Sequence, residues 1–216
     1  MDPRALIDGL ISYLALVVLL TFHEFGHAWM AWRCGDDTAR LQGRVSLNPL
    51  VHIDLIGTVI LPLLMLLVPG AGRFIIGWAK PVPVNPYNLR NPRVDDILVT
   101  LAGPWMNLVL AVVCMGLARV GLMLHSANMV DLCLDTAHIS LLLCFFNLLP
   151  IPPLDGSQVV RALTRMSYET YAQIARFGFL ILIIALQLPF ITGPLNHVTH
   201  RSWVIIGGWF GIPLAA

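Results

Sequence analysis

The sequence predicts an all-α membrane protein, a polytopic helical bundle of about five to six spans. Short β-strands or a re-entrant segment are expected between the first and third long spans. Of the 216 residues, 57% are hydrophobic and only 12% are charged, about half the charged share of a soluble domain. The mean hydropathy is +0.79. We expect one integral membrane domain over residues 1–216, with a core at 5–156 and C-terminal spans at 174–214.

The first predicted span covers residues 5–32, an apolar run longer than that of a cleavable signal peptide. We therefore expect it to remain as a helix. Residues 36–49 are polar and basic, and the alternation at 44–47 predicts short strands. The second apolar run, 55–68, is short and contains Pro62, so the sequence leaves open whether it crosses the bilayer.

Residues 70–86 lie between two apolar runs, yet they carry Pro81, Pro83 and Pro86. Prolines at this spacing exclude a helix and favour an extended chain. The neighbouring side chains are too apolar for a solvated loop, so we expect the segment to enter the membrane and line an internal cavity. Alternatively, it is a loop lying flat at the interface, with Trp78 as an anchor.

The remaining apolar runs predict the later spans. A long span is expected at 97–124 and another at 130–149, which ends where three prolines within 150–153 must unwind the helix. The run 174–191 predicts a further span. Residues 203–214 are short for a crossing, and we interpret them as tilted or interfacial.

Counting crossings relates Asp155 to the first span. If residues 70–86 fold back to the side reached after the first span, Asp155 returns to that side as well. Nine of the 13 basic residues then share it: Arg33, Arg40, Arg44, Lys80, Arg90, Arg93, Arg161, Arg165 and Arg176. The positive-inside rule makes this side cytoplasmic.

The stretch His23-Glu24-Phe25-Gly26-His27 matches the pattern H-E-x-x-H inside the first predicted span. Residues four apart lie on one face of a helix, so both imidazoles can bind a single ion. Glu24 can hold a metal-bound water without being a ligand itself. Three ionisable groups in one helical turn at membrane depth indicate function. The alternative is a buried polar cluster that only joins helices.

A catalytic zinc usually has three protein ligands and one open position, so a third ligand is expected. We favour Asp155, which follows the proline-broken helix end and precedes the flexible Gly156. Alternatively, Asp155 is an ordinary helix N-cap. Asp135 and His138 compete as ligands from within the fourth long run, and we interpret His52 as an interface residue or a gate.

Three more motifs accompany H-E-x-x-H. They are G-W-A-K-P-V-P-V-N-P at 77–86, G-P-x-x-N at 103–107 and N-x-x-P-x-P-x-L-D-G at 147–156. In this order, over about residues 21–155, the set resembles the site-2 protease family of intramembrane zinc metalloproteases. The resemblance is to its compact microbial members, without a PDZ or CBS domain.

The resemblance implies one Zn²⁺ per chain, with His23, His27 and Asp155 as ligands and Glu24 as the base that activates water. It implies hydrolysis of peptide bonds within or near transmembrane segments of membrane proteins. It also implies that Asn147 contacts the substrate backbone or steadies the oxyanion. The alternative for Asn147 is a side chain that caps the broken helix.

Four more residues are expected to contact substrate. Asn107 belongs to the G-P-x-x-N motif, and Lys80, Pro81 and Val82 belong to the extended segment. A helical substrate hides its peptide groups, so it must unwind before it is cut. An extended segment at 70–86 could then pair with it by β-addition.

The expected partners are a transmembrane protein or peptide substrate and the lipid bilayer. We expect a multi-pass protein of the bacterial cytoplasmic (inner) membrane, with its active site open to the cytosol. The net charge of +1 gives no reason to expect nucleic-acid binding. The competing function is a membrane zinc transporter or a non-catalytic metal-binding scaffold, in which Glu24 would have no task.

Overall fold

The computed structural model describes residues 3–67 and 77–214, and the regular secondary structure of these residues is helical, with no strand among them. The helices follow one another as α1 (Pro3–Arg33), α2 (Thr38–Leu41), α3 (Leu61–Leu67), α4 (Pro92–Met123), α5 (Ala127–Asn147), α6 (Asp155–Thr164), α7 (Tyr168–Ala175), α8 (Gly178–Ala185) and α9 (Pro189–Trp209). A π-helical turn, η2 (Leu55–Ile60), leads directly into α3, and 3-10 turns cover Pro49–Val51 and Pro86–Asn88.

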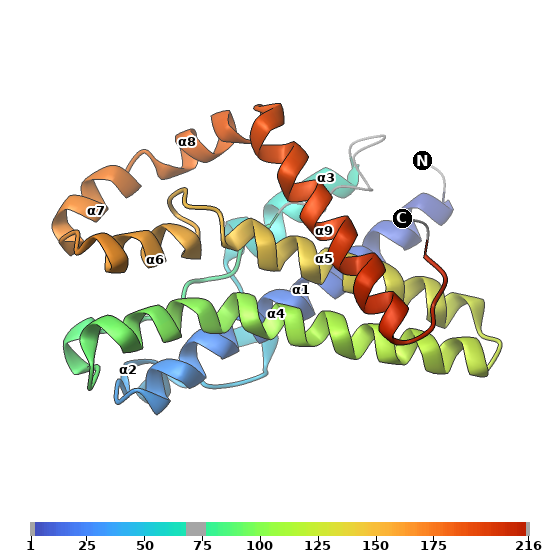
Figure 1. Ribbon diagram of the computed structural model, residues 1–216, viewed down its shortest axis with the longest axis horizontal. Helices are drawn as coiled ribbons and strands as arrows, with labels where there is room; N and C mark the ends of the chain where they lie inside the picture. Colours follow the sequence, from blue (N-terminus) through green and yellow to red (C-terminus); the bar gives the residue numbers. More distant parts are fainter. Residues whose placement is uncertain (1–2, 68–76, 215–216) are drawn as a thin grey trace.

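Helices α1, α4 and α5 form the centre of the molecule, and α4 packs against both of the others (Figure 1). Each is long and apolar enough to cross a bilayer; at 1.5 Å per residue the 31 residues of α1 reach about 47 Å. The α8–α9 pair, bent by 78°, passes the same test as one broken span. The described residues thus hold three candidate spans, or four with the bent pair.

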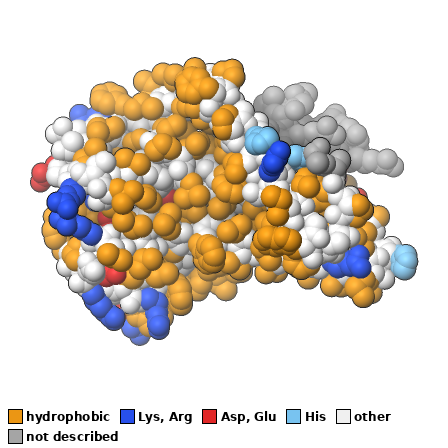
Figure 2. Space-filling model, in the orientation of Figure 1, with side chains coloured by type: hydrophobic (Ala, Val, Ile, Leu, Met, Phe, Trp, Pro, Cys, Tyr) orange, Lys and Arg blue, Asp and Glu red, His pale blue; other side chains and the backbone are white. Residues whose placement is uncertain are grey.

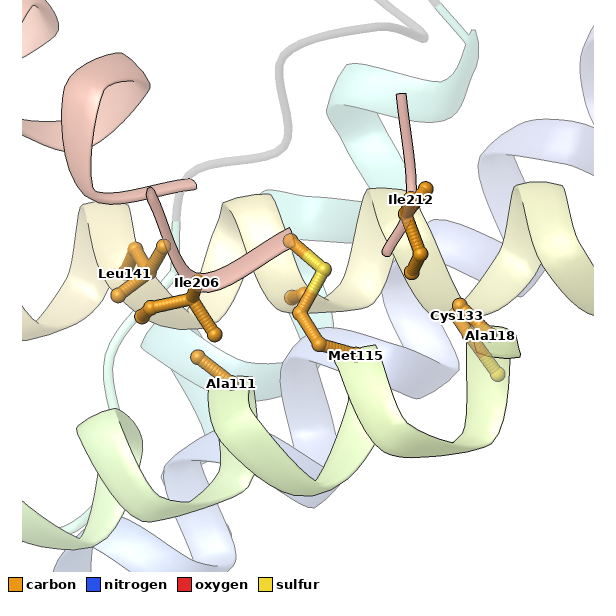
Figure 3. Packing of buried hydrophobic residues seen from close by; sticks show 8 residues of the cluster. Ala111, Met115, Ala118, Cys133, Leu141, Ile206 and Ile212 are labelled. Carbon is orange, nitrogen blue, oxygen red and sulfur yellow. The ribbon is translucent and has the colours of Figure 1, made fainter. Parts of the chain in front are cut away.

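A core of small and flexible side chains joins α4, α5 and α9. Ala111, Met115 and Ala118 of α4 are fully buried against Leu141 of α5 and Ile206 of α9 (Figure 3). Small residues let helix backbones approach closely, which is how helices associate where lipid removes the hydrophobic driving force between them. This packing fixes α5, and with it the start of α6.

Large apolar side chains cover much of the outer surface, and Lys and Arg gather mainly at the end that carries α2 and the start of α4 (Figure 2). Apolar patches of this extent are rare on soluble monomers and are expected where lipid is the solvent. The distribution agrees with a membrane protein whose basic end lies at one interface.

Two predicted elements differ from the structure. Residues 44–47 form bends rather than the predicted short strands, because Arg44 is buried and its side chain bonds to a distant carbonyl. The run 174–191 is not one span: α7 ends at Ala175 and α8 at Ala185, and Pro189 begins α9. Proline at the first position starts a new helix but cannot continue an old one.

The chain between α1 and α4 leaves and returns on the same side. The Arg90 N–H donates to the Cys34 carbonyl at 3.0 Å, so residues just after α1 and just before α4 touch. The 13-residue stretch Leu55–Leu67 is too short to span a bilayer as a helix. Residues just after α1 and just before α4 therefore lie at the same end of the molecule, while residues 70–76 of the predicted re-entrant segment lie outside the described residues.

Candidate metal centre

Two helices, α1 and α6, bring three donor atoms together. His23 and His27 project from the same face of α1, and Asp155 is the first residue of α6. Asp155 Oδ2 lies 3.1 Å from His23 Nε2 and 3.4 Å from His27 Nε2. The two Nε2 atoms are 3.0 Å apart. Among the described residues, this is the group of His, Cys, Asp and Glu side chains whose spacing fits a metal ion.

The donor set fits zinc. Tetrahedral Zn–N bonds of about 2.05 Å place two nitrogens roughly 3.3 Å apart, close to the observed 3.0 Å. Asp155 Oδ2 is buried and has no hydrogen-bond partner of good geometry, although both imidazoles are near it. Three donor atoms that face one centre, with the carboxylate oxygen among them unsatisfied, fit a cation site.

Helix α4 positions both histidines from one side. His27 Nδ1 lies 2.8 Å from the Val99 carbonyl oxygen, and His23 Nδ1 lies 3.2 Å from the Asn107 amide nitrogen. The carbonyl can only accept, so His27 carries its proton on Nδ1 and its Nε2 lone pair is free for a metal. Gly103 lies between these contacts, where any Cβ would collide with both imidazole rings.

Asn107 is wholly buried and its orientation follows from its neighbours. As drawn, the amide nitrogen faces His23, while Oδ1 is buried without a partner. Turning the amide by 180° lets Oδ1 accept from the His23 Nδ1–H, the tautomer that leaves Nε2 free. The Asn107 backbone is held by the Ser140 hydroxyl, which donates to its carbonyl at 2.7 Å. Asn107 therefore lies beside His23, and its predicted contact with substrate stays a prediction.

Asp155 is placed by the turn that precedes it and by α6. A Cβ at Gly156 would collide with the Leu148 backbone, so only glycine permits this close approach of α6 to the end of α5. One side of α6 is then fixed to α4 by a buried ion pair between Arg161 and Asp96. The Arg161 guanidinium also lies 3.9 Å from the centre of the Tyr168 ring. Sequence reasoning missed this pair, because a lone arginine and a lone aspartate 65 residues apart carry no pattern.

Glu24 faces the extended segment. Its Oε2 accepts a hydrogen bond from the Val82 N–H at 2.9 Å. Residues 77–85 are extended without helical structure, and alternate N–H groups point into the protein. Three are used in this way: Trp78 to the Gly57 carbonyl at 3.1 Å, Lys80 to the His52 carbonyl at 2.9 Å, and Val82 to Glu24.

The opposite, outward edge of this segment has fewer N–H groups than the inward edge. Successive residues of an extended chain face opposite sides, so Pro81 and Pro83 fall on the outward edge. Proline has no N–H. Over 79–83 the outward edge therefore offers carbonyl oxygens and a single N–H, that of Ala79.

The other predicted site residues lie elsewhere. The Asn147 amide donates to the Leu143 carbonyl of its own helix at 3.0 Å, which matches its interpretation as a side chain that ends the helix. His138 packs edge-on against Trp203 of α9 and Asp135 is exposed on α5, outside the group of three donors. His52 is buried, with Nε2 2.9 Å from the Ser46 carbonyl oxygen.

Comparison with known proteins assigns this arrangement to a family. The family model of Peptidase family M50 matches residues 11–126 and 118–186, which together cover most of the chain. The chain belongs to peptidase family M50. The predicted membership of the site-2 protease family is thereby confirmed.

Among the M50 relatives, zinc metalloprotease YwhC of Bacillus subtilis is 34% identical over 198 residues, covering 87% of this chain and 84% of that protein. Zinc metalloprotease Rip2 of Mycolicibacterium smegmatis is 32% identical over 188 residues, covering 83% and 70%. Rip2 of Mycobacterium tuberculosis (strain H37Rv) is 31% identical over 197 residues, covering 86% and 73%. No solved structure matches the chain significantly.

Membership of family M50 makes the chain an intramembrane zinc metalloprotease and an integral membrane protein. The family acts on membrane-protein substrates in the bilayer. The transporter or scaffold alternative is not favoured, because the family and the relatives' names both indicate a protease.

Proposed function

We propose that His23, His27 and Asp155 hold one zinc ion per chain and that Glu24 of the H-E-x-x-H motif is the catalytic base. The observation that carries the proposal is the convergence of three donor atoms, each pair within 4.8 Å, from α1 and α6. Glu24 adjoins the first ligand in the sequence and is not one of the three.

The chemistry follows from these positions. Zinc supplies Lewis-acid activation of a water molecule and of the scissile carbonyl. Glu24 takes the proton of the attacking water and returns it to the leaving amine. Val99 keeps the His27 proton on Nδ1, and Asn107 does the same for His23, so both Nε2 atoms stay available as ligands. We assign Asn107 to this task in place of the predicted substrate contact.

Substrate binding is proposed along the stretch Lys80, Pro81 and Val82 of the extended segment, where Pro81 lies on the outward edge. An unwound transmembrane segment has free N–H groups, and the carbonyls of this edge accept them by β-addition. Asn147, at the end of α5, is proposed as a further contact. Its amide oxygen remains available, because the amide nitrogen makes the bond to Leu143.

The orientation is proposed from charge. Arg33, at the end of α1, and Arg93, at the start of α4, lie on the side to which Asp155 returns, so the positive-inside rule places this end in the cytosol. We propose a single domain in the bacterial cytoplasmic membrane with its site open to the cytosol. A total of five to six spans would require crossings by Leu55–Leu67 and by α8 and α9 separately.

A proteome comparison tests the function. Membranes containing the wild-type protein are compared with membranes containing Glu24→Gln, scored for fragments cut within transmembrane segments. We expect such fragments only with the wild type, while zinc measured on the purified proteins is equal, since the ligands are intact. Near wild-type cleavage by Glu24→Gln would remove Glu24 as the base.

Metal analysis of a second variant tests the third ligand. Asp155→Asn should lower the zinc affinity, because a neutral amide is a poorer zinc ligand than a carboxylate. Full zinc retention by Asp155→Asn would return Asp155 to the role of a helix cap.

A further inference from the structure

A buried arginine lies next to the Glu24 contact and has no role in the proposed mechanism. Arg44 is only 5% exposed, and among the described residues its side chain makes one hydrogen bond, from Nη2 to the Lys80 carbonyl at 2.5 Å. Its Nε is buried with no partner among the described residues. No carboxylate in that part of the chain forms an ion pair with it. A buried unpaired cation is costly, so its retention calls for a reason.

The Lys80 carbonyl and the Val82 N–H are neighbours on the inward edge of the extended segment. The same edge is held at the Lys80 N–H by the His52 carbonyl. Arg44 therefore binds the Lys80 carbonyl, which lies one peptide group before the Val82 N–H that donates to Glu24. Burial lowers the pKa of Arg44, and the negative charge of Glu24 counteracts this, which indicates that the two charges lie near each other.

We propose that Arg44 is a positioning residue for Glu24, and that it acts through the backbone of the extended segment. The guanidinium fixes the Lys80 carbonyl, and this places the Val82 N–H where it holds one oxygen of the Glu24 carboxylate. The other oxygen is left to face the water. The inference rests on the proposed role of Glu24 as the base.

The alternative is that Arg44 only stabilises a loop. Kinetics on the purified protein distinguish the two roles, with a transmembrane protein found cleaved in the proteome comparison as the substrate. A misplaced base lowers kcat and leaves KM unchanged. We expect Arg44→Met to lower kcat roughly 10- to 100-fold, with equal zinc content and unchanged KM. Arg44→Lys, which keeps a donor for the carbonyl, should recover most of the loss.

Two controls accompany this series. Arg40→Met removes an exposed cation of the neighbouring helix α2, and kcat should stay at the wild-type value. Val82→Pro removes the donor to Glu24, whereas Val82→Ala keeps it. We expect kcat of Val82→Pro to be at least tenfold below that of Val82→Ala. Because Arg44 is proposed to act through the Val82 N–H, this ratio can overturn the inference even if Arg44→Met fails to fold.

The inference is overturned by an unchanged kcat in Arg44→Met, by a rise in KM alone, or by loss of zinc. A ratio near one between Val82→Ala and Val82→Pro overturns it as well. If these variants are active while Glu24→Gln is inactive, only the inference fails. If Glu24→Gln is itself active, the proposed function fails with it.

Discussion

The N–H of Arg90 donates to the carbonyl of Cys34, so the chain that leaves α1 returns to the same point before it enters α4. Because α4 and α5 then run out and back, α6 begins beside the part of α1 that carries His23 and His27. This return is what brings Asp155 to the histidines.

Cysteine labelling tests the resulting topology. Arg40→Cys and Thr164→Cys, both at exposed positions, should react with an impermeant reagent from the cytoplasmic side only. Asn128→Cys, at the exposed start of α5, should react only from the opposite side. Opposite accessibility of positions 40 and 164 would separate the two halves of the site and contradict the shared centre.

Asn107→Leu should weaken zinc binding about 10- to 100-fold, because His23 loses the partner that fixes its ring. Asn107→Asp keeps an acceptor for the His23 Nδ1–H and should retain more zinc. Competition with a chelator measures both affinities. Wild-type affinity in Asn107→Leu would show that the contact does not hold the ligand.

Gly103→Ala should abolish activity and reduce zinc content, since its Cβ would occupy the space of the imidazole rings. The matched control lies on the same helix. A Cβ at Gly116 would make only ordinary contacts with Phe210, so Gly116→Ala should stay active and gain up to about 1 kcal/mol of helix stability. Equal zinc content in the two variants would mean that α4 can move away from the histidines.

The buried Asp96–Arg161 pair should behave as a unit. Arg161→Met alone leaves Asp96 buried and unpaired, which costs about 3–5 kcal/mol. The double variant Asp96→Leu with Arg161→Met removes both charges and should lose less. Unfolding of the wild type, the single variants Asp96→Leu and Arg161→Met, and the double variant in the same detergent measures the free energies. If the double variant loses the sum of the single losses, the charges are not coupled.

The lowered pKa of Asp36 should make the free energy of unfolding depend on pH. Burial alone would raise its pKa, but hydrogen bonds from Thr38, Asn85 and Asn88 outweigh burial and lower the pKa. A folded-state pKa below the unfolded value of ~3.9 stabilises the protein above that pH, and the contribution disappears as pH falls through the folded value.

Asp36→Asn is the reference for this effect. Wild type and variant should differ by a constant free energy of unfolding from pH 5 to 7, and the difference should shrink below about pH 4. A difference that persists unchanged at lower pH would mean that the charge of Asp36 is not what stabilises the loop.

The sequence predicted the three long spans because long apolar runs leave few other structures. It predicted that His23 and His27 share one face of a helix, because residues four apart in a helix lie on the same face. Apolar composition could not reveal the breaks in the run 174–191, since a broken helix and a continuous one bury similar surface. The prediction of strands at 44–47 was wrong. Alternation of polar and apolar residues cannot reveal that the Arg44 side chain bonds to the distant Lys80 carbonyl.

The contribution of α4 to the site was the least predictable part. Val99 acts through its backbone carbonyl, which every residue type has. Gly103 leaves room for the imidazole rings because it has no side chain. Asn107 was expected to contact the substrate. These roles depend on how α4 packs against α1, a tertiary relationship with no local pattern in the sequence.

The prolines on the outward edge of 79–83 have a consequence for assembly. Two exposed strands associate when each supplies donors to the other's acceptors. An edge that is almost entirely acceptor is not complementary to its own copy, so neighbouring molecules in a crowded bilayer gain little by pairing through it. A chain with free N–H groups does complement it. The same two residues thus disfavour self-association while leaving the edge available to an unwound foreign segment.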